Sequence, residues 1–598
     1  MTYQVPRADI QFVFEHLIDL PALFSLPGNE ELSADLLQAV LDEAARYIEQ
    51  EVVPLNRKAD TQPPQLTAQG VQTTPGFQAA YQAFQQAGWQ GLQHEAEHGG
   101  QGLPKLVGAA VGESMSAACA AFALCPVLTD SVIETLILAG TPEQQALYLP
   151  AMMTGAWAGT MNLTESQAGS DLSLVQCLAT AQEDGSYRLR GEKIFISYGA
   201  HDLAENIIHL VLARTPDAPA GVGGLSLFLV PQYLAQAQGN LPAGARNDVV
   251  CASLEHKMGL HGSPTAVMRY GDNGGEVGVG AIGYLVGELH QGLSYMFITM
   301  NAARYAIALQ GIGVADRALS QAEHYAAERQ QGPDLEHRFP SPVRIQHHPD
   351  VERMLQTMRA LTEGTRAFSY YGAWLKDMAL KHPDPEQRAI YQRQHEFLVP
   401  IVKGFATEMV NEVSSLGIQV HGGMGFIEET GAAQYLRDSR VFSIYEGTTA
   451  IQANDLVGRK ILRDQGQQAL ALLEPIYQTL EELQHQAAQH PVLDLIAQNL
   501  QQACEAYTQS IEHLLAQHQG SQRRAVFFGS VPFLMLSGVV LGGWMMARSA
   551  LLCTQAQTDF MRKKLSTAIC YAVYVLPRAQ AYAQSIEGSQ WVAQSSLN

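Results

Sequence analysis

The sequence predicts a mainly α-helical protein with a central β domain. Apolar residues recur at helical spacing on both sides of residues 169–283, whereas inside that range short apolar and β-branched runs alternate with turn-forming residues. The length of 598 residues is also more than one compact core needs. It corresponds to roughly three to six domains.

The amino-terminal part, residues 1–158, is predicted to be a helical domain. From Asn29 to Glu51 the apolar side chains recur every three or four residues, namely Leu36, Leu37, Val40, Leu41, Ala44, Tyr47 and Ile48. Helical patterning continues in the segments up to Trp157.

The central part, residues 159–283, is predicted to form β-strands. Clusters of Gly, Pro, Asp and Asn separate its apolar runs, which are Tyr187–Arg190, Lys193–Ile196, Ile207–Leu212 and Leu225–Pro231. Short runs between turn signals are typical of antiparallel strands.

Helical periodicity returns after Gly292. The segments 293–328, 351–379, 389–416 and 435–462 have the lengths of bundle helices, so residues 284–463 are assigned to a helix bundle. The Gln-rich stretch 464–468 is interpreted as a linker, and residues 469–598 as an additional carboxy-terminal helical domain.

That last domain contains an uncharged stretch, Ala525–Ala547. About 20 such residues can span a bilayer. A helix that is hydrophobic all round is equally typical of the core of a large helical domain. Because the stretch contains Pro532 and four glycines and stands alone in the chain, we expect a buried helix here and no membrane contact.

Charge and cysteine usage argue against several function classes. With 37 Lys and Arg against 58 Asp and Glu, the net charge is −21, which disfavours binding to nucleic acid. The seven cysteines include no Cys-x-x-Cys pair, so we expect neither a disulfide framework nor a metal site. The amino terminus lacks the apolar stretch of a secretory signal, and we therefore expect a cytoplasmic protein.

Three segments carry residues suited to ligand binding. The loop 161–171 is rich in small and hydroxyl residues that let a ligand approach the backbone, although such loops usually only connect elements. Gly422, Gly423 and Gly425 follow a predicted helix and could receive a pyrophosphate, but no strand precedes them as in a dinucleotide-binding unit. Glu446 stands beside Gly447 among apolar residues, and is either a residue at a helix amino terminus or a desolvated base.

Taken together, these segments resemble the acyl-CoA dehydrogenase family. The shared motifs are GW at 88–89, GGQGLP at 99–104, TESQAGSD at 164–171, FIS at 195–197, QVHGGMG at 419–425, RD at 437–438 and YEGT at 445–448. The resemblance covers roughly residues 30–465. Within the family the chain is most similar to long members of the 3-methylmercaptopropionyl-CoA dehydrogenase type, which have an added amino-terminal segment, here residues 1–30, and a further carboxy-terminal helical domain.

The resemblance implies a β-barrel as the central domain and an FAD-dependent oxidoreductase. In this family a Glu removes the α proton of an acyl-CoA, FAD accepts the β hydride, and a trans-2-enoyl-CoA is formed. Glu446 occupies the position of that base. The electrons are expected to pass to an electron-transfer flavoprotein, and the substrate is either a fatty acyl-CoA of β-oxidation or 3-methylmercaptopropionyl-CoA. Two alternatives stay open: an acyl-CoA oxidase that uses oxygen, and a non-catalytic acyl-CoA-binding homologue.

The resemblance also implies which residues bind ligands. The implied FAD-binding residues are Met161, Leu163, Thr164, Gly169, Ser170, Phe195, Ile196, Ser197, Arg329, Gln419, Gly422, Gly423, Thr448 and Thr449. The implied substrate-binding residues are Ser170, Asn301, Arg304 and Gly447. Because Arg329 matches a residue that reaches the FAD of a neighbouring subunit, a homodimer or homotetramer is expected. Phe195 stands where relatives often have Trp, which keeps an aromatic face but loses the indole N–H donor.

Overall fold

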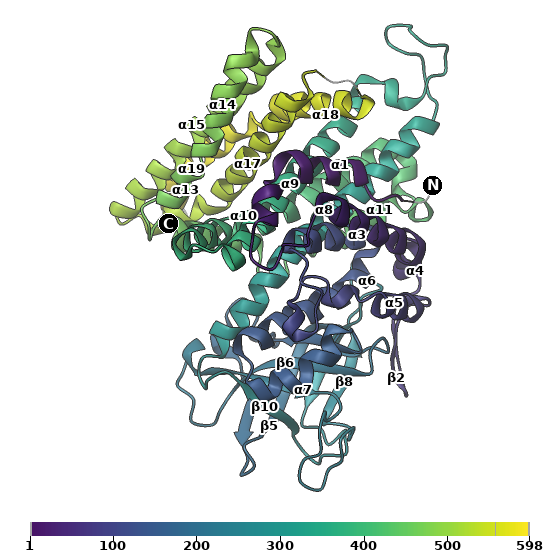
Figure 1. The fold of residues 1–598 in the computed structure, drawn as a ribbon, viewed down its shortest axis with the longest axis vertical. Helices are drawn as coiled ribbons and strands as arrows, with labels where there is room; N and C mark the ends of the chain where they lie inside the picture. Colours follow the sequence, from purple (N-terminus) through teal and green to yellow (C-terminus); the bar gives the residue numbers. More distant parts are fainter. Residues whose placement is uncertain (1–2, 556–557, 596–598) are drawn as a thin grey trace. The chain divides into compact units, whose positions relative to one another are not determined.

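The computed structural model describes residues 3–555 and 558–595, and the chain divides into two compact units (Figure 1). The barrel unit consists of Gln50–Leu103 and Ala118–Ala306. The helical unit consists of Met1–Glu49, Pro104–Ala117 and Ile307–Asn598. Two long helices, α6 (Lys105–Ala139) and α8 (Gly292–Glu328), contribute residues to both units.

The barrel unit contains a sheet of eight strands in which five strands close into a ring. The strands are β3 (Trp157–Asn162), β4 (Leu178–Ala181), β5 (Tyr187–Ser197), β6 (Asn206–Arg214), β7 (Leu225–Pro231), β8 (Val249–Leu254), β9 (Thr265–Tyr270) and β10 (Ala281–Val286). The order β10-β7-β6-β4-β5 returns to β10 through a second pairing of β5, while β9 and β8 continue the sheet from β5 and β3 pairs with β6. Strand β6 is buried along most of its length, as expected for the interior of a closed sheet.

Three local expectations for this unit need correction. The runs predicted at 187–190 and 193–196 are parts of one strand, β5, with a register shift between Lys193 and Ile196. Strand β3 pairs with β6 in parallel, so the sheet is mixed and not purely antiparallel. A hairpin of β1 (Gln65–Thr67) and β2 (Gly70–Gln72) also interrupts the region expected to be helical, because strands of three residues are too short to show a period in the sequence.

The barrel unit also carries shorter helices, α4 (Leu55–Thr61), α5 (Phe77–Gln86) and α7 (Pro142–Met153). Helix α7 begins with a capping box in which Thr141 and Gln144 satisfy each other's backbone N–H groups, and Pro142 occupies the first turn, where its missing donor costs nothing.

The helical unit is built around helices α9 (Pro349–Lys381) and α10 (Pro385–His421), which pack against each other. They confirm the helices predicted at 351–379 and 389–416, and each begins earlier than predicted, with Pro in its first turn. The amino-terminal helices of this unit are α1 (Arg7–Phe12), α2 (Leu20–Phe24) and α3 (Ala34–Tyr47). The helix predicted at 435–462 is wrong as a single element, because α11 (Ala432–Ser439) ends before a loop and α12 (Thr449–Asp455) starts after it.

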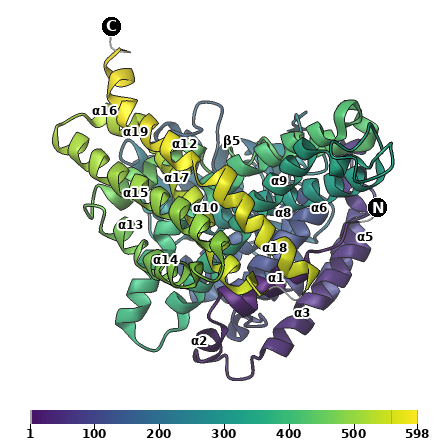
Figure 2. The same ribbon diagram turned by 90° about the horizontal axis from the view of Figure 1, so that it is seen from above.

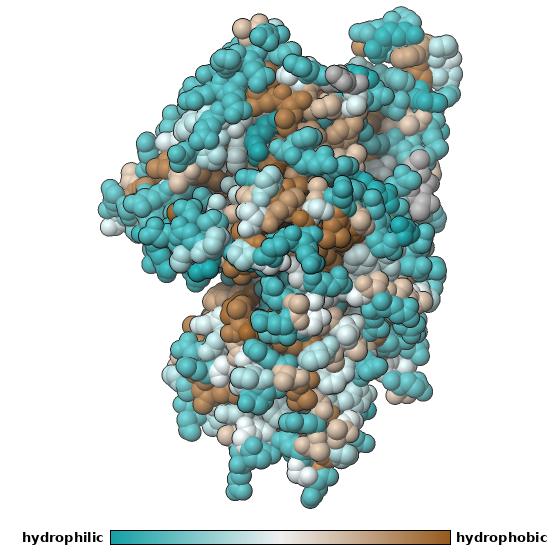
Figure 3. Space-filling model, viewed as in Figure 1, coloured by the Kyte–Doolittle hydropathy of each residue, from teal (hydrophilic) through white to brown (hydrophobic). Residues whose placement is uncertain are grey.

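The carboxy-terminal part of the helical unit comprises α13 (Gln467–Ala471), α14 (Glu474–Ala487), α15 (Pro491–Gln519), α16 (Arg523–Phe528), α17 (Ser530–Cys553), α18 (Asp559–Cys570) and α19 (Arg578–Ser595). Helices α15, α17 and α19 contact one another (Figure 2). The face of α14 and α15 seen in Figure 3 is largely hydrophilic. Helix α13 begins inside the predicted linker 464–468, so the linker is shorter than expected.

Helix α17 contains most of the uncharged stretch, and it is the core helix of this part. It contacts α9, α10 and α12 of the preceding bundle and α14, α15, α18 and α19 of the carboxy-terminal part. Its apolar side chains are buried nearly all round, which confirms the expected buried helix. By length and composition two described helices, α6 and α17, could cross a membrane, and for α17 the burial accounts for that composition.

Candidate functional site

In the helical unit, the loop between α11 and α12 holds Glu446 in an unusual backbone conformation. Glu446 has φ +53° and Gly447 has φ +91°, both in the left-handed region that side chains other than glycine rarely adopt. Glu446 is therefore not a first-turn residue of a helix: the amino-terminal cap of α12 is Thr448, whose hydroxyl accepts from the backbone N–H of Ile451 at 3.4 Å. Glu446 and Gly447 are half-buried.

Polar side chains from neighbouring helices hold this loop. The Tyr445 hydroxyl donates to the side-chain oxygen of Gln310 on α8, and burial, followed by the carboxylate of Glu446, raises the pKa of Tyr445 well above its usual value. Gln452 on α12 donates from Nε2 to the carbonyl oxygens of Glu446 and Gly447, both at 3.3 Å.

Thr449, the other predicted ligand residue of this loop, points into the helical unit. Its hydroxyl donates to Glu408 of α10, and its backbone N–H donates to the carbonyl of Ser443 at 3.1 Å. Thr449 is buried, so its observed contacts hold the start of α12 in place.

The predicted pyrophosphate residues lie where α10 ends. Gln419, Gly422 and Gly423 are exposed, and Gly422 has φ +59°. A Cβ atom on Gly422 or Gly423 would meet no atom within 4 Å, so this backbone is open to an approaching ligand. Arg329, directly after α8, is also exposed.

In the barrel unit, the loop after β3 is held by a buried ion pair that the sequence analysis did not identify. Lys193 of β5 is completely buried, and its ammonium lies 2.7 Å from the carboxylate of Glu165 and 2.9 Å from the carbonyl oxygen of Leu163. Burial alone raises the pKa of Glu165, but Lys193 and two backbone N–H donors hold that pKa below its usual value. The one signal in the sequence is a lysine directly before the apolar run Ile194–Ile196 of a predicted strand.

This ion pair fixes one end of the predicted flavin loop and leaves the other end open. Met161 is buried in β3, and Leu163 and Thr164 are half-buried. A tight turn with two backbone hydrogen bonds between Glu165 and Ala168 follows. Gly169 and Ser170 then lie exposed, and a Cβ on Gly169 would meet nothing within 4 Å.

The second predicted flavin segment lies at the end of β5. Phe195 has φ +60° at the register shift of that strand, and the residue is 60% exposed, which is unusual for a large apolar residue. Ile196 beside it is buried, and the carbonyl of Ser197 accepts from Thr160 of β3 at 2.8 Å. The strand thus holds an aromatic ring outside the packed barrel.

The predicted substrate residues Asn301 and Arg304 lie one helical turn apart on α8. The guanidinium of Arg304 donates to the Asn301 side-chain oxygen at 3.1 Å, and Arg304 is buried. The helical spacing alone brings these two side chains together.

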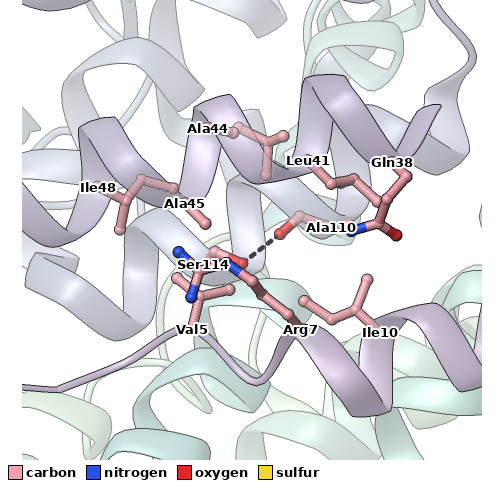
Figure 4. Close-up of a pocket in the computed structure, with 11 residues that line it drawn as sticks. Val5, Arg7, Ile10, Gln38, Leu41, Ala44, Ala45, Ile48, Ala110 and Ser114 are labelled. Atoms are coloured by element: carbon pink, nitrogen blue, oxygen red, sulfur yellow. Dashed lines mark hydrogen bonds between the residues drawn. The ribbon is translucent and has the colours of Figure 1, made fainter. Parts of the chain in front are cut away.

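A small pocket in the helical unit lies apart from all predicted site residues. Helices α1, α3 and α6 line it with mainly apolar side chains (Figure 4). Two of its polar side chains are already paired, since Arg7 binds Glu49 at 2.9 Å and the Ser114 hydroxyl donates to the carbonyl of Ala110 at 2.8 Å. It is therefore not a candidate for the substrate or cofactor site.

Comparison with protein-family models assigns most of the chain. The acyl-CoA dehydrogenase amino-terminal, middle and carboxy-terminal domains match residues 35–156, 160–272 and 290–462. A further model, described as acetyl-CoA dehydrogenase C-terminal like, matches residues 472–592.

Individual relatives match over almost the whole length. The chain is 49% identical to 3-methylmercaptopropionyl-CoA dehydrogenase from Ruegeria pomeroyi, over 97% of each chain. It is 33% identical to the broad-specificity linear acyl-CoA dehydrogenase FadE5 of Mycobacterium tuberculosis, again over 97% of each chain. An acyl-CoA dehydrogenase structure from Bacillus anthracis, complexed with FAD, shares the fold with a TM-score of 0.70 at 21% identity, covering 96% of this chain and 91% of that one.

The family models and the full-length relatives agree with the motifs around Glu446 and after β3. The chain therefore belongs to the acyl-CoA dehydrogenase family, whose members are FAD-dependent enzymes that dehydrogenate acyl-CoA thioesters.

Proposed function

We propose that Glu446 is the general base that removes the α proton of the acyl-CoA thioester. The observation that carries this proposal is the pair of consecutive left-handed residues, Glu446 and Gly447, in a short loop braced by buried polar contacts. Backbone held in a sparsely populated conformation is typical of functional sites. A half-buried carboxylate is also less well solvated than a surface one, which favours proton abstraction.

The backbone N–H of Glu446 and the missing side chain of Gly447 also suit this loop to binding the thioester group. In the family, a backbone N–H of the catalytic Glu binds the thioester oxygen, and an N–H fixed before the reaction stabilises the negative charge that develops there. Gly447 has no side chain to block the thioester from approaching this N–H.

The residues assigned to FAD suit that cofactor. Gly169, Gly422 and Gly423 present backbone without neighbouring atoms, and hydroxyl and amide groups stand beside them at Ser170 and Gln419. The exposed Phe195 ring offers a flat apolar face for an isoalloxazine. Bound FAD would supply the acceptor for the β hydride; the protein residues hold it and exclude water.

We further propose that the enzyme works as a homodimer or homotetramer with an electron-transfer flavoprotein as acceptor. The exposed position of Arg329 after α8 supports a contact with the pyrophosphate of a neighbouring subunit's FAD. A monomer that retains FAD tightly would contradict this assignment.

For the substrate, we propose 3-methylmercaptopropionyl-CoA or a linear fatty acyl-CoA. The support is the 49% identity to the Ruegeria pomeroyi enzyme, compared with 33% to the broad-specificity Mycobacterium tuberculosis enzyme. A panel of acyl-CoA esters from C4 to C16 together with 3-methylmercaptopropionyl-CoA, assayed with an artificial acceptor, ranks these substrates. Peroxide formed at the turnover rate without any flavoprotein acceptor would instead support an oxidase.

The substitution Glu446→Gln tests the assignment of the base. We expect this variant to retain FAD and to lose at least about a hundredfold in rate, since a positioned general base contributes that much or more. Glu481→Gln, on the exposed face of α14, is the matched control and is expected to keep the parental rate. Near-normal turnover of Glu446→Gln would refute the assignment.

A further inference from the structure

A buried lysine lies directly behind the Glu446 loop. Lys403 is in the middle of α10 and is completely buried. Its ammonium donates to the carbonyl oxygen of Phe442 at 2.9 Å and to that of Gly447 at 2.7 Å. One side chain therefore bridges the two ends of the segment that contains Glu446.

The chemistry of Lys403 makes these contacts strong. Transfer of an ammonium out of water is very unfavourable unless hydrogen bonds compensate for the lost solvation. Hydrogen bonds from a charged donor are also stronger than those between neutral groups, and more so inside a protein than in water. A methionine or leucine would occupy this buried part of α10, where Val402, Phe405 and Ala406 are also buried, without this cost, so packing alone does not explain the lysine.

The loop needs such contacts because its conformation is unfavourable. Glu446, a residue with a full side chain, has φ +53°, and the next residue has φ +91°. A backbone of this kind persists only where surrounding contacts over-determine it. Lys403 binds the Gly447 carbonyl from α10, while Gln452 binds the carbonyls of both Glu446 and Gly447 from α12.

We infer that Lys403, assisted by Gln452, is a positioning residue for the base. By fixing the carbonyl groups of Phe442 and Gly447, on either side of Glu446, it holds the carboxylate and the backbone N–H of Glu446 in the arrangement needed for proton removal. Lys403 itself contacts neither substrate nor flavin in this role. The inference rests on the proposed function of Glu446.

The substitution Lys403→Met removes the charge and both hydrogen bonds but keeps most of the side-chain volume. We expect kcat to fall by about 10- to 100-fold, as for a small displacement of a catalytic group, with KM changed less than about threefold. Lys564→Met is the matched control, because Lys564 is equally buried in the same unit but binds Asp9 and Glu363 instead of the loop. It is expected to lower the melting temperature without changing kcat once folded.

Proton removal can be measured without hydride transfer. Methylthioacetyl-CoA has sulfur at its β position and therefore no β hydride, so deuterium uptake from D₂O at its α carbon reports the base alone. We expect Lys403→Met to slow this exchange by the same factor as kcat, and Lys564→Met to leave it unchanged. If Lys403→Met does not fold, Gln452→Met decides by the same two measurements, with a smaller loss expected because its bonds are longer.

The outcomes separate this inference from the proposed function. If Glu446→Gln is inactive while folded Lys403→Met, or Gln452→Met in its place, shows parental kcat and exchange, the positioning role is wrong and the base assignment stands. If Glu446→Gln keeps its activity and exchange, the proposed function itself fails. A loss confined to KM in Lys403→Met would also overturn the inference.

Discussion

Arg366 of α9 and Asp9 of α1 form an ion pair in the interior of the helical unit, with 2.6 Å between Nη1 and Oδ2. The same guanidinium contacts Glu113 at 2.6 Å and Asp316 at 2.8 Å, so helices α1, α6, α8 and α9 meet at one buried charge. Asp9 also binds Lys564 of α18. The added amino-terminal segment and the carboxy-terminal helices are thereby attached to the bundle through a common network.

Arg366→Met is expected to destabilise the helical unit strongly, because it leaves three carboxylates without their shared cation. Loss of one partner of a buried pair costs about 3–5 kcal/mol. The measurement is the melting temperature of the unfolding transition. Arg562→Met, which removes an exposed pair with Asp559 on α18, is the control and is expected to have little effect. Equal melting temperatures for the two variants would contradict a structural role for the buried network.

From the raised pKa of Asp377 in α9 we expect the free energy of unfolding to fall as the pH approaches neutrality. Its carboxylate accepts from the backbone N–H groups of Lys105 and Leu106 at 2.7 and 3.0 Å, and burial raises its pKa to about 7. A carboxyl whose pKa is higher in the folded than in the unfolded protein stabilises the fold fully below the unfolded pKa, and this contribution is lost as the pH rises through the folded pKa.

We therefore expect Asp377 to contribute a decrease in melting temperature from about pH 4 to pH 7. Asp377→Asn cannot titrate, so its melting temperature should fall less over this range than that of the parent. Identical pH profiles for the two proteins would show that Asp377 keeps an ordinary pKa.

Gly538 of α17 lies where this helix packs closely against α10 of the bundle. A methyl group on Gly538 would lie 2.2 Å from the ring of Phe405 on α10. Gly538→Ala should therefore destabilise the protein by about 1–3 kcal/mol through overpacking. Gly588→Ala in α19 meets no atom within 4 Å and should be neutral or stabilising by up to about 1 kcal/mol, since Ala is the better helix former. Thermal unfolding of the two variants compares them directly.

We expect the ring of Phe195 to contribute to the affinity for FAD. Phe195→Ala removes the exposed ring at the end of β5, and we expect FAD to bind at least about tenfold more weakly, the equivalent of one aromatic stacking contact. Phe195→Trp should retain FAD. Trp591→Ala, at another exposed aromatic residue, is the control. FAD titration followed by flavin fluorescence gives the dissociation constants, and equal values for Phe195→Ala and the parent would refute the contact.

Much of this architecture follows from the sequence, because periodicity records which side of an element is buried. It correctly predicted the long helices α8, α9 and α10, the buried helix in α17 and the strands β6 and β7. It failed at the helix predicted over 435–462, where the apolar pattern continues through the Glu446 loop and does not reveal that the chain leaves the helix. Periodicity also did not predict the parallel pairing of strand β3, because its partner β6 lies more than forty residues later in the chain.

By itself, the sequence determined the family, the order of the helical and β regions, and Glu446 as the candidate base, because motifs specify chemical groups and their order. Only the tertiary structure decided how those groups are held. The left-handed conformation of Glu446, the contact of Lys403 with Gly447 and the burial of Lys193 with Glu165 all depend on neighbours from other segments of the chain. The physical reason is that a charged side chain such as Lys403 or Lys193 can be buried only when folding brings partners from distant segments within hydrogen-bonding distance.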